Sequence, residues 1–198
     1  MRNLIKRISA LLLCLLLVLS LAVTALAEEA KDTDEAAAAE EGTTLRILRQ
    51  KQFLDFAENC RLDSYSRNLS VVLLTDIDLT GVDFAGIPIF CGNFDGNGHT
   101  ISGLSITRDG SNMGLFRYVD ASALIQNLTV SGEIIPDGSR SAVGGIAGHN
   151  AGKIQNCFFD GTVSGSDDVG GIDGNNANTA INNVFNSKRV INSEQRVG

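Results

Sequence analysis

The sequence has no tryptophan and contains only two tyrosines, two histidines and two prolines among its 198 residues. Carbohydrate-binding surfaces generally use tryptophan or tyrosine platforms, and this chain has only Tyr65 and Tyr118 for such a role. General acid–base catalysis most often uses histidine. Here His99 and His149 belong to no recognisable nucleophile motif, and we expect His149 to be a solvated turn residue.

Basic residues are also scarce, since 16 Lys and Arg stand against 23 Asp and Glu, for a net charge of −7. No basic stripe is available to neutralise phosphates, so nucleic acid is not an expected partner. Much of the acidity lies in residues 28–42, EEAKDTDEAAAAEEG, which offer no apolar face to bury. We therefore predict that this segment is a disordered acidic linker.

The most apolar segment is near the N-terminus, from Ile8 to Val18, where Ser9 is the one polar residue, and it follows three basic residues. The segment closes with Ala25-Leu26-Ala27, the small residues that a signal peptidase needs. This order predicts a secretory signal peptide over residues 1–27, with an uncleaved membrane anchor as the alternative. We expect a secreted, extracellular or surface-associated protein that does not insert into the membrane after cleavage.

The predicted mature chain keeps three cysteines, Cys60, Cys91 and Cys157. An odd number is not a closed disulfide framework, although Cys60 and Cys91 leave one pairing open. Cys157 lies where equivalent repeats have Leu128 and Val184, so it is predicted to be a small core residue. No C-x-x-C or His/Cys cluster indicates zinc, and we expect no metal and no cofactor.

Glycine, by contrast, is abundant, with 21 residues, and much of it belongs to an internal repeat. Val143-Gly-Gly-Ile-Ala-Gly148 recurs as Val169-Gly-Gly-Ile-Asp-Gly174, a step of 26 residues. Each unit also leads to an Ile-x-Asn segment, which begins at Ile154 and at Ile181. A period of this length indicates a solenoid, in which each unit buries its apolar residues against its neighbours.

Aligning the units gives four columns of mostly apolar residues at spacings that are largely period two, the pattern of a strand with one buried face. The phase shifts once, at Asn127, Asn156 and Asn183, and asparagine tolerates the left-handed backbone that such a bend needs. Stacked asparagines also form side-chain ladders. The predicted columns are Ile101, Ile125, Ile154, Ile181; Leu104, Leu128, Cys157, Val184; Ile106, Val130, Phe159, Asn186; and Ile134, Val163, Val190.

These columns predict an all-β fold, a parallel β-helix of about five coils over residues 43–198. Phe53, Phe56, Ala57 and Cys60 recur at helical spacing, which predicts a short helix that caps the first coil. The other end has only polar residues to discourage pairing of its exposed strand edges. We therefore expect self-association through the C-terminal coil.

Two further segments make a family resemblance specific, Phe94-Asp-Gly-Asn-Gly-His-Thr-Ile-Ser-Gly-Leu104 and Met113-Gly-Leu-Phe116. Together with the Val-Gly-Gly-Ile-x-Gly-x-Asn units, they resemble the GLUG-motif repeat proteins, which are bacterial secreted and surface proteins, some adhesin-like. The resemblance covers about residues 44 to 185 and implies a right-handed β-helix with an extracellular role. It implies no catalytic activity.

The obvious candidates for catalysis are Asp76, Asp78 and Asp95, and we interpret them as turn and strand-end residues. Asp95-Gly-Asn-Gly98 superficially resembles a calcium loop, but His99 stands where the EF-hand pattern requires Asp or Asn. We therefore assign no catalytic, cofactor-binding or metal site. The expected function is a non-catalytic, adhesin-like structural or interaction module, whose protein or glycan partner is unknown. The alternatives are a small β-helical carbohydrate-active enzyme, either lyase or glycosidase, and a truncated remnant of a longer GLUG repeat protein.

Overall fold

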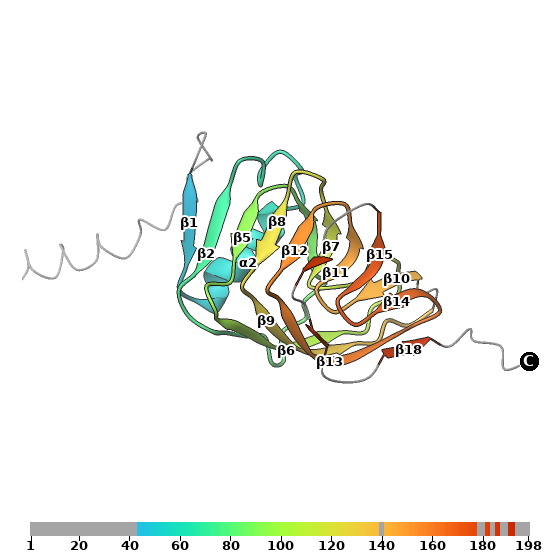
Figure 1. Ribbon diagram of the computed structural model, residues 1–198. Coiled ribbons are helices and arrows are strands. Elements are labelled where there is room, and N and C mark those ends of the chain that lie inside the picture. The colour runs from blue at the N-terminus through green and yellow to red at the C-terminus, as the bar shows by residue number, and fades with distance from the viewer. Residues whose placement is uncertain (1–42, 139–140, 178–180, 183–184, 187–189, 193–198) are drawn as a thin grey trace, which may run out of the picture. The chain divides into compact units, whose positions relative to one another are not determined.

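The computed structural model describes residues 43–138, 141–177, 181–182, 185–186 and 190–192 (Figure 1). The predicted signal peptide and acidic linker lie outside these residues, as do Asn183 and Val184. The described part of the chain contains one helix, α2 (Gln50–Asn59), and otherwise short strands joined by tight corners. None of its helices is long and apolar enough to span a membrane.

The strands form four parallel sheets, each of which takes one strand from successive coils. The first sheet has the order β1 (Thr44–Ile47), β2 (Ser70–Leu73), β5 (Asn93–Asp95), β8 (Leu124–Gln126), β12 (Lys153–Gln155) and β16 (Ile181–Asn182). The second has the order β3 (Ile77–Asp78), β6 (Thr100–Ile106), β9 (Thr129–Ile134), β13 (Phe158–Gly165) and β17 (Phe185–Asn186), and β18 (Val190–Asn192) also pairs with β13.

The third sheet consists of β4 (Ile87–Phe90), β7 (Phe116–Val119), β11 (Ala147–Asn150) and β15 (Asp173–Asn176). The fourth pairs β10 (Ser141–Gly144) with β14 (Asp167–Gly170). Because every neighbour in a sheet comes from the next coil of the chain, the molecule is a parallel β-solenoid of about five turns. The predicted fold class is confirmed, and Figure 1 shows β5, β8 and β12 side by side.

The interior is filled by columns of apolar side chains that lie in register from coil to coil. In the first sheet, Val71, Phe94, Ile125 and Ile154 are paired in succession, and each is at most 1% exposed. The predicted alignment of the three later units is confirmed for the described residues, since Ile154 pairs with Ile181. Stacked aliphatic columns remove apolar surface from water at every coil, which is the main stabilising contribution in this fold.

The first unit, however, was misaligned in the sequence-based columns. Ile101 pairs with Val130, and it is Phe94 that pairs with Ile125. The corner after Phe94 contains two more residues than the corner after Ile125, so the similar Ile-x-x-Leu pattern at Ile101 was placed one strand too early. A further irregularity in β6 lies between Ile101 and Leu104.

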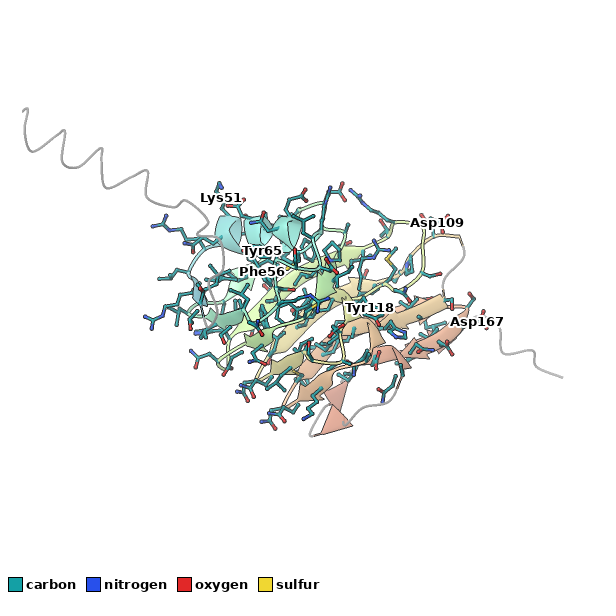
Figure 2. The ribbon with its side chains drawn as sticks, turned by 90° about the horizontal axis from the view of Figure 1, so that it is seen from above. Lys51, Phe56, Tyr65, Asp109, Tyr118 and Asp167 are labelled. Atoms are coloured by element: carbon teal, nitrogen blue, oxygen red, sulfur yellow. The ribbon has the colours of Figure 1, made fainter. Side chains whose placement is uncertain are left out.

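Helix α2 closes the N-terminal end of the solenoid, as predicted. Phe53, Phe56 and Ala57 on one face are buried. The ring of Phe56 lies 6.0 Å from that of Phe90 and 6.0 Å from that of Phe94, centroid to centroid. In Figure 2 Lys51 points away from the body of the protein on the outer side of this helix. The first coils have no preceding coil to cover their apolar side chains, and the helix covers these side chains instead.

Candidate functional site

A shallow groove of about 320 Å³ runs across the outside of the second sheet. It crosses β6, β9 and β13, the three strands that lie side by side in Figure 1. Its floor is a stack of glycines from three coils, and its walls are polar side chains from the two later coils. The lining residues are Gly103, Ser131, Gly132, Glu133, Asp160, Gly161 and Thr162.

The glycines on the floor are required by close contacts between coils. A Cβ at Gly132 would lie 2.0 Å from the carbonyl oxygen of Leu104, and one at Gly161 would lie 2.0 Å from that of Gly132. Gly132 also has φ of +150°, a conformation that other residues rarely adopt. Gly132 and Gly161 stand at the inward-facing positions of their strands, since Gly132 pairs with the buried Leu104. The outward side chains on either side are therefore separated by a strip of backbone, and a groove remains between them.

The polar walls follow from the register of β9 and β13. Ser131 pairs with Asp160, and Glu133 pairs with Thr162, so each cross-strand pair combines one hydroxyl with one carboxylate. The two carboxylates therefore lie on a diagonal, one on each side of the glycine line. Hydroxyls both donate and accept hydrogen bonds, whereas ionised carboxylates only accept them.

Phe158 lies on the same strand and the same face as Asp160, two residues earlier. The strand alternates between half-buried and buried side chains, and Phe158 is half-buried whereas Phe159 is fully buried. Phe158 therefore lies on the outer face of the sheet. It places an aromatic ring on the face that contains the groove, next to Thr129 of the preceding coil.

The first sheet carries two polar ladders on its outer side. Gln155 Nε2 donates to Gln126 Oε1 at 2.8 Å, and Gln126 Nε2 donates to Asp95 Oδ2 at 3.0 Å. In parallel, Asn156 Nδ2 donates to Asn127 Oδ1 at 3.2 Å, and Asn127 Nδ2 donates to Asp95 Oδ1 at 3.0 Å. The predicted asparagine ladder is confirmed for Asn127 and Asn156, which both have φ of 52°. Asp95 accepts the last bond of both ladders.

The calcium-like segment forms a tight turn, because Asn97 N donates to Asp95 Oδ1 at 2.8 Å. Within the described ranges, no three His, Cys, Asp or Glu side chains are grouped so that they could hold a metal ion.

Asp76 and Asp78 both bind backbone N–H groups at corners. Asp76 Oδ1 accepts from Thr100 N at 2.9 Å and lies 3.1 Å from His99 Nδ1, and these contacts, that of Thr100 first, lower the pKa of Asp76. Asp78 Oδ1 accepts from Thr80 N at 2.9 Å, and hydrogen bonds from Thr80 lower the pKa of Asp78. The two carboxylates thus help to fix turns, as the sequence indicated.

His149 does not lie in a turn, contrary to the prediction, but in β11, where it pairs with Tyr118 of β7 and Asn175 of β15. The His149 and Tyr118 rings are stacked, with centroids 4.9 Å apart and planes inclined by 5°. The glycines around His149 suggested a turn, yet they allow close packing of Gly148 against the Asn112–Met113 backbone. Tyr118 is labelled in Figure 2.

Cys60, Cys91 and Cys157 are buried free thiols, so the possible Cys60–Cys91 bond is not formed in this structure. Cys157 is 2% exposed, in agreement with its prediction as a core residue. Burial raises the pKa of Cys157 to about 11 and that of Cys60 to about 12. Buried thiols with raised pKa values are poor nucleophiles, so these cysteines are structural.

Asp173 is an unusual residue that the sequence-based reasoning missed. It continues the interior column of the third sheet, after Phe116 and Ala147, which are both fully buried. Both carboxylate oxygens are buried and have no hydrogen-bond partner in the part of the chain that the structure describes. Burial raises the pKa of Asp173 to about 7, and the nearby Asn150 side chain and Asn175 backbone offset this only in part. The signal was visible as the change from Ala to Asp between the two Val-Gly-Gly-Ile-x-Gly units.

Comparisons with known proteins agree with this architecture. The sequence profile of the GLUG motif matches residues 139–164. Halomucin from Haloquadratum walsbyi is 33% identical over 158 residues, which cover 74% of this chain but 2% of halomucin. A protein named as a Gly-rich membrane protein, from Evansella cellulosilytica, is 36% identical over 96 residues, which cover 42% of this chain and 11% of that protein. No solved structure matches.

The fold and the stacked columns define the class of this chain as a parallel β-solenoid repeat protein. More specifically, the chain contains a GLUG motif at residues 139–164, so the resemblance seen in the sequence is confirmed there. The chain spans only a small fraction of the length of the relatives it matches.

Proposed function

We propose that this protein acts at the cell surface or as a secreted protein, as a non-catalytic structural and interaction module with adhesin-like character. The observation that supports this most is the in-register stack of GLUG-type coils, with apolar columns inside and polar side chains outside. Such a body presents an extended outer surface and uses its interior for stability alone. The relatives named halomucin and Gly-rich membrane protein favour a surface or extracellular location.

Fractionation of cells that express the chain from its own start codon tests this function. We expect the protein in the medium or in the protease-accessible surface fraction, with residues 1–27 removed, as measured by immunoblotting and by mass spectrometry of its N-terminus. A chain that stays in the cytosol with these residues intact would contradict the proposal. Replacing Leu12 and Leu15 with Arg is the control, because it disrupts the apolar run and should block export.

A carbohydrate-active enzyme is the second candidate, and the groove gives it one specific observation. Strands about 4.8 Å apart with a rise of about 3.3 Å per residue place the Cα atoms of Asp160 and Glu133 about 8 Å apart. Inverting glycosidases hold their carboxyl groups roughly 6.5–9.5 Å apart, a separation that side chains on Cα atoms so placed can adopt. Incubation with pectins, uronates and host glycans distinguishes the candidates. Turnover that Glu133→Gln or Asp160→Asn abolishes would establish the enzyme and refute the non-catalytic module.

A further inference from the structure

Two of the three buried cysteines lie near the C-terminal end of helix α2. Cys60 directly follows the helix, and its N–H group donates to the carbonyl oxygen of Phe56 at 3.1 Å, so it continues the helical backbone. Cys91 directly follows β4, at the corner that leads into β5. Cys60 is 0% exposed and Cys91 is 4% exposed. Any partner of either thiol in the folded protein must therefore be another group of the same chain.

The side chain of Ser66 connects the two cysteines. Ser66 is fully buried, and its hydroxyl oxygen accepts a hydrogen bond from Cys91 N at 3.0 Å. The same hydroxyl group is a hydrogen-bond partner of both thiols, those of Cys60 and Cys91. Burial, and then the nearby Cys91 sulfur, raise the pKa of Cys60 to about 12, although the hydrogen bond with Ser66 lowers it. The two sulfurs are therefore neighbours around one hydroxyl group.

The backbone at this place is held by close packing. A Cβ at Gly92 would lie 2.5 Å from the carbonyl oxygen of Ser66, so the corner after Cys91 rests directly on the turn between α2 and β2. The ring of Tyr65, in the same turn, lies 6.5 Å from that of Phe56, and Figure 2 labels the two residues side by side. The fold thus holds together two thiols that are far apart in the chain.

We propose that Cys60 and Cys91 form a disulfide bond in the exported protein, and that Cys157 remains a free thiol. The oxidant is a small disulfide or a thiol–disulfide oxidoreductase outside the cytoplasm. The thiolate of one cysteine attacks a sulfur of the oxidant and displaces the other sulfur as a thiolate. The second cysteine then attacks this mixed disulfide and releases the remaining half of the oxidant. Two protein thiols become one disulfide, and their two protons pass to the two thiols to which the oxidant is reduced.

Burial determines when this bond forms and what it does. Buried thiols react slowly, so oxidation takes place while the N-terminal coils are still folding. The bond then ties the end of α2 to the corner between β4 and β5, and it keeps the helix over the aromatic side chains that it covers. The closed loop, residues 61–90, also restricts the unfolded chain, which stabilises the folded state.

The remaining cysteine lies in a later coil, at the corner after β12, where Cys157 Sγ donates to Gln155 O at 3.3 Å. It is an internal reference, because it should stay reduced under the same conditions. The proposal rests on the proposed export of the protein, since the cytosol keeps thiols reduced. The two are separately testable, because the bond is measured in a glutathione buffer and does not depend on where the protein is found.

Refolding of the purified exported form in glutathione buffers tests the proposal. The protein is reduced and unfolded in urea, refolded at increasing ratios of oxidised to reduced glutathione, quenched with acid, unfolded, alkylated and digested with trypsin. We expect mass spectrometry to find tryptic peptides 52–61 and 68–108 joined, and peptide 154–188 alkylated at Cys157. The equilibrium constant for the bond should be roughly a hundredfold or more higher in the folded protein than in urea, because folding and the bond stabilise each other equally.

Two variants complete the test. Cys157→Ala is the matched control and should leave the joined peptides unchanged. Dithiothreitol should lower the thermal unfolding temperature of the oxidised wild type by roughly 5–15 °C and leave that of Cys91→Ala unchanged. Alkylation of all three cysteines at every ratio, a bond from Cys157 to either of the others, or a bond equally favourable in urea would overturn the proposal. If Cys91→Ala does not fold, the joined peptides of the wild type decide alone.

Discussion

Asp173→Ala should stabilise the protein, and the gain should depend on pH. The substitution restores the residue that Ala147 provides in the same column one coil earlier. It removes a carboxylate whose two oxygens are buried without a hydrogen-bond partner among the described residues. Burial of an uncompensated charge is unfavourable, so the folded wild-type protein favours the protonated form of Asp173.

The raised pKa fixes the direction of the pH dependence. Because the pKa of Asp173 is about 7 in the folded protein and 3.8 ordinarily, the folded state binds more protons between these values. The contribution of Asp173 protonation to the wild-type unfolding free energy is therefore fully present below about pH 4, and it is lost as the pH rises to about 7. A shift of this size corresponds to about 4 kcal/mol at most, and partial solvent exposure reduces it to about 2–4 kcal/mol. Asp173→Ala should remove this decrease.

Urea denaturation at pH 5 and pH 8, followed by far-ultraviolet circular dichroism, measures the effect. We expect the variant to exceed the wild type by about 2–4 kcal/mol at pH 8 and by clearly less at pH 5. Asp167→Ala, at an exposed position on β14, is the control and should show no such difference. A variant that is less stable than the wild type at pH 8, or equally affected at both pH values, would refute the reasoning.

Four other substitutions test the packing of the coils, and a fifth tests the exposed edge of the C-terminal coil. Ile154→Ala should lower the unfolding free energy by about 2–5 kcal/mol, because it empties part of an interior column. Gln155→Ala loses one ladder hydrogen bond and should lower the unfolding free energy by about 1 kcal/mol. Equal effects of the two variants in urea denaturation would contradict the assignment of inward and outward faces. Gly132→Ala should lower it by about 3 kcal/mol or more through overlap with the neighbouring coil. At Gly98 a Cβ would meet nothing within 4 Å, so Gly98→Ala should lower the unfolding free energy by only about 1 kcal/mol, through its positive φ. A larger loss of stability for Gly98→Ala than for Gly132→Ala would contradict the argument that contacts between coils require Gly132. Finally, Val190 is 41% exposed, and Val190→Lys should reduce the self-association that we propose for the C-terminal coil; sedimentation of a strictly monomeric wild type would rule that association out.

The sequence was sufficient to predict the fold because the later repeats are nearly regular. Ile125, Ile154 and Ile181 recur at almost constant spacing, and their pairing in the first sheet is as predicted. The same regular spacing gave a wrong alignment where one coil differs in length. Ile101 was misplaced because a corner can gain two residues without changing the apolar pattern on either side of it.

The groove, by contrast, was not predicted. Glu133 and Asp160 are separated by 27 positions in the chain, and only the register of β9 and β13 brings them to opposite sides of one glycine line. The glycine column containing Gly132 and Gly161 was visible in the sequence, but its consequence for the outer surface was not. Side chains outside a solenoid follow no burial pattern, so periodicity alone does not identify which of them act together.

The groove, the ladders and the position of Asp173 all depend on one claim, the register between successive coils. Disulfide cross-linking tests it most directly. Gln126 and Gln155 are paired across β8 and β12, so cysteines at both positions should form a disulfide under mild oxidation. Cysteines at Gln126 and Lys153 serve as the control, because the diagonal offset places their Cα atoms about 8 Å apart, too far for a bridge. The account predicts cross-linking of the first pair alone, measured by mass spectrometry of tryptic peptides, and cross-linking of the second pair in preference to the first would contradict it.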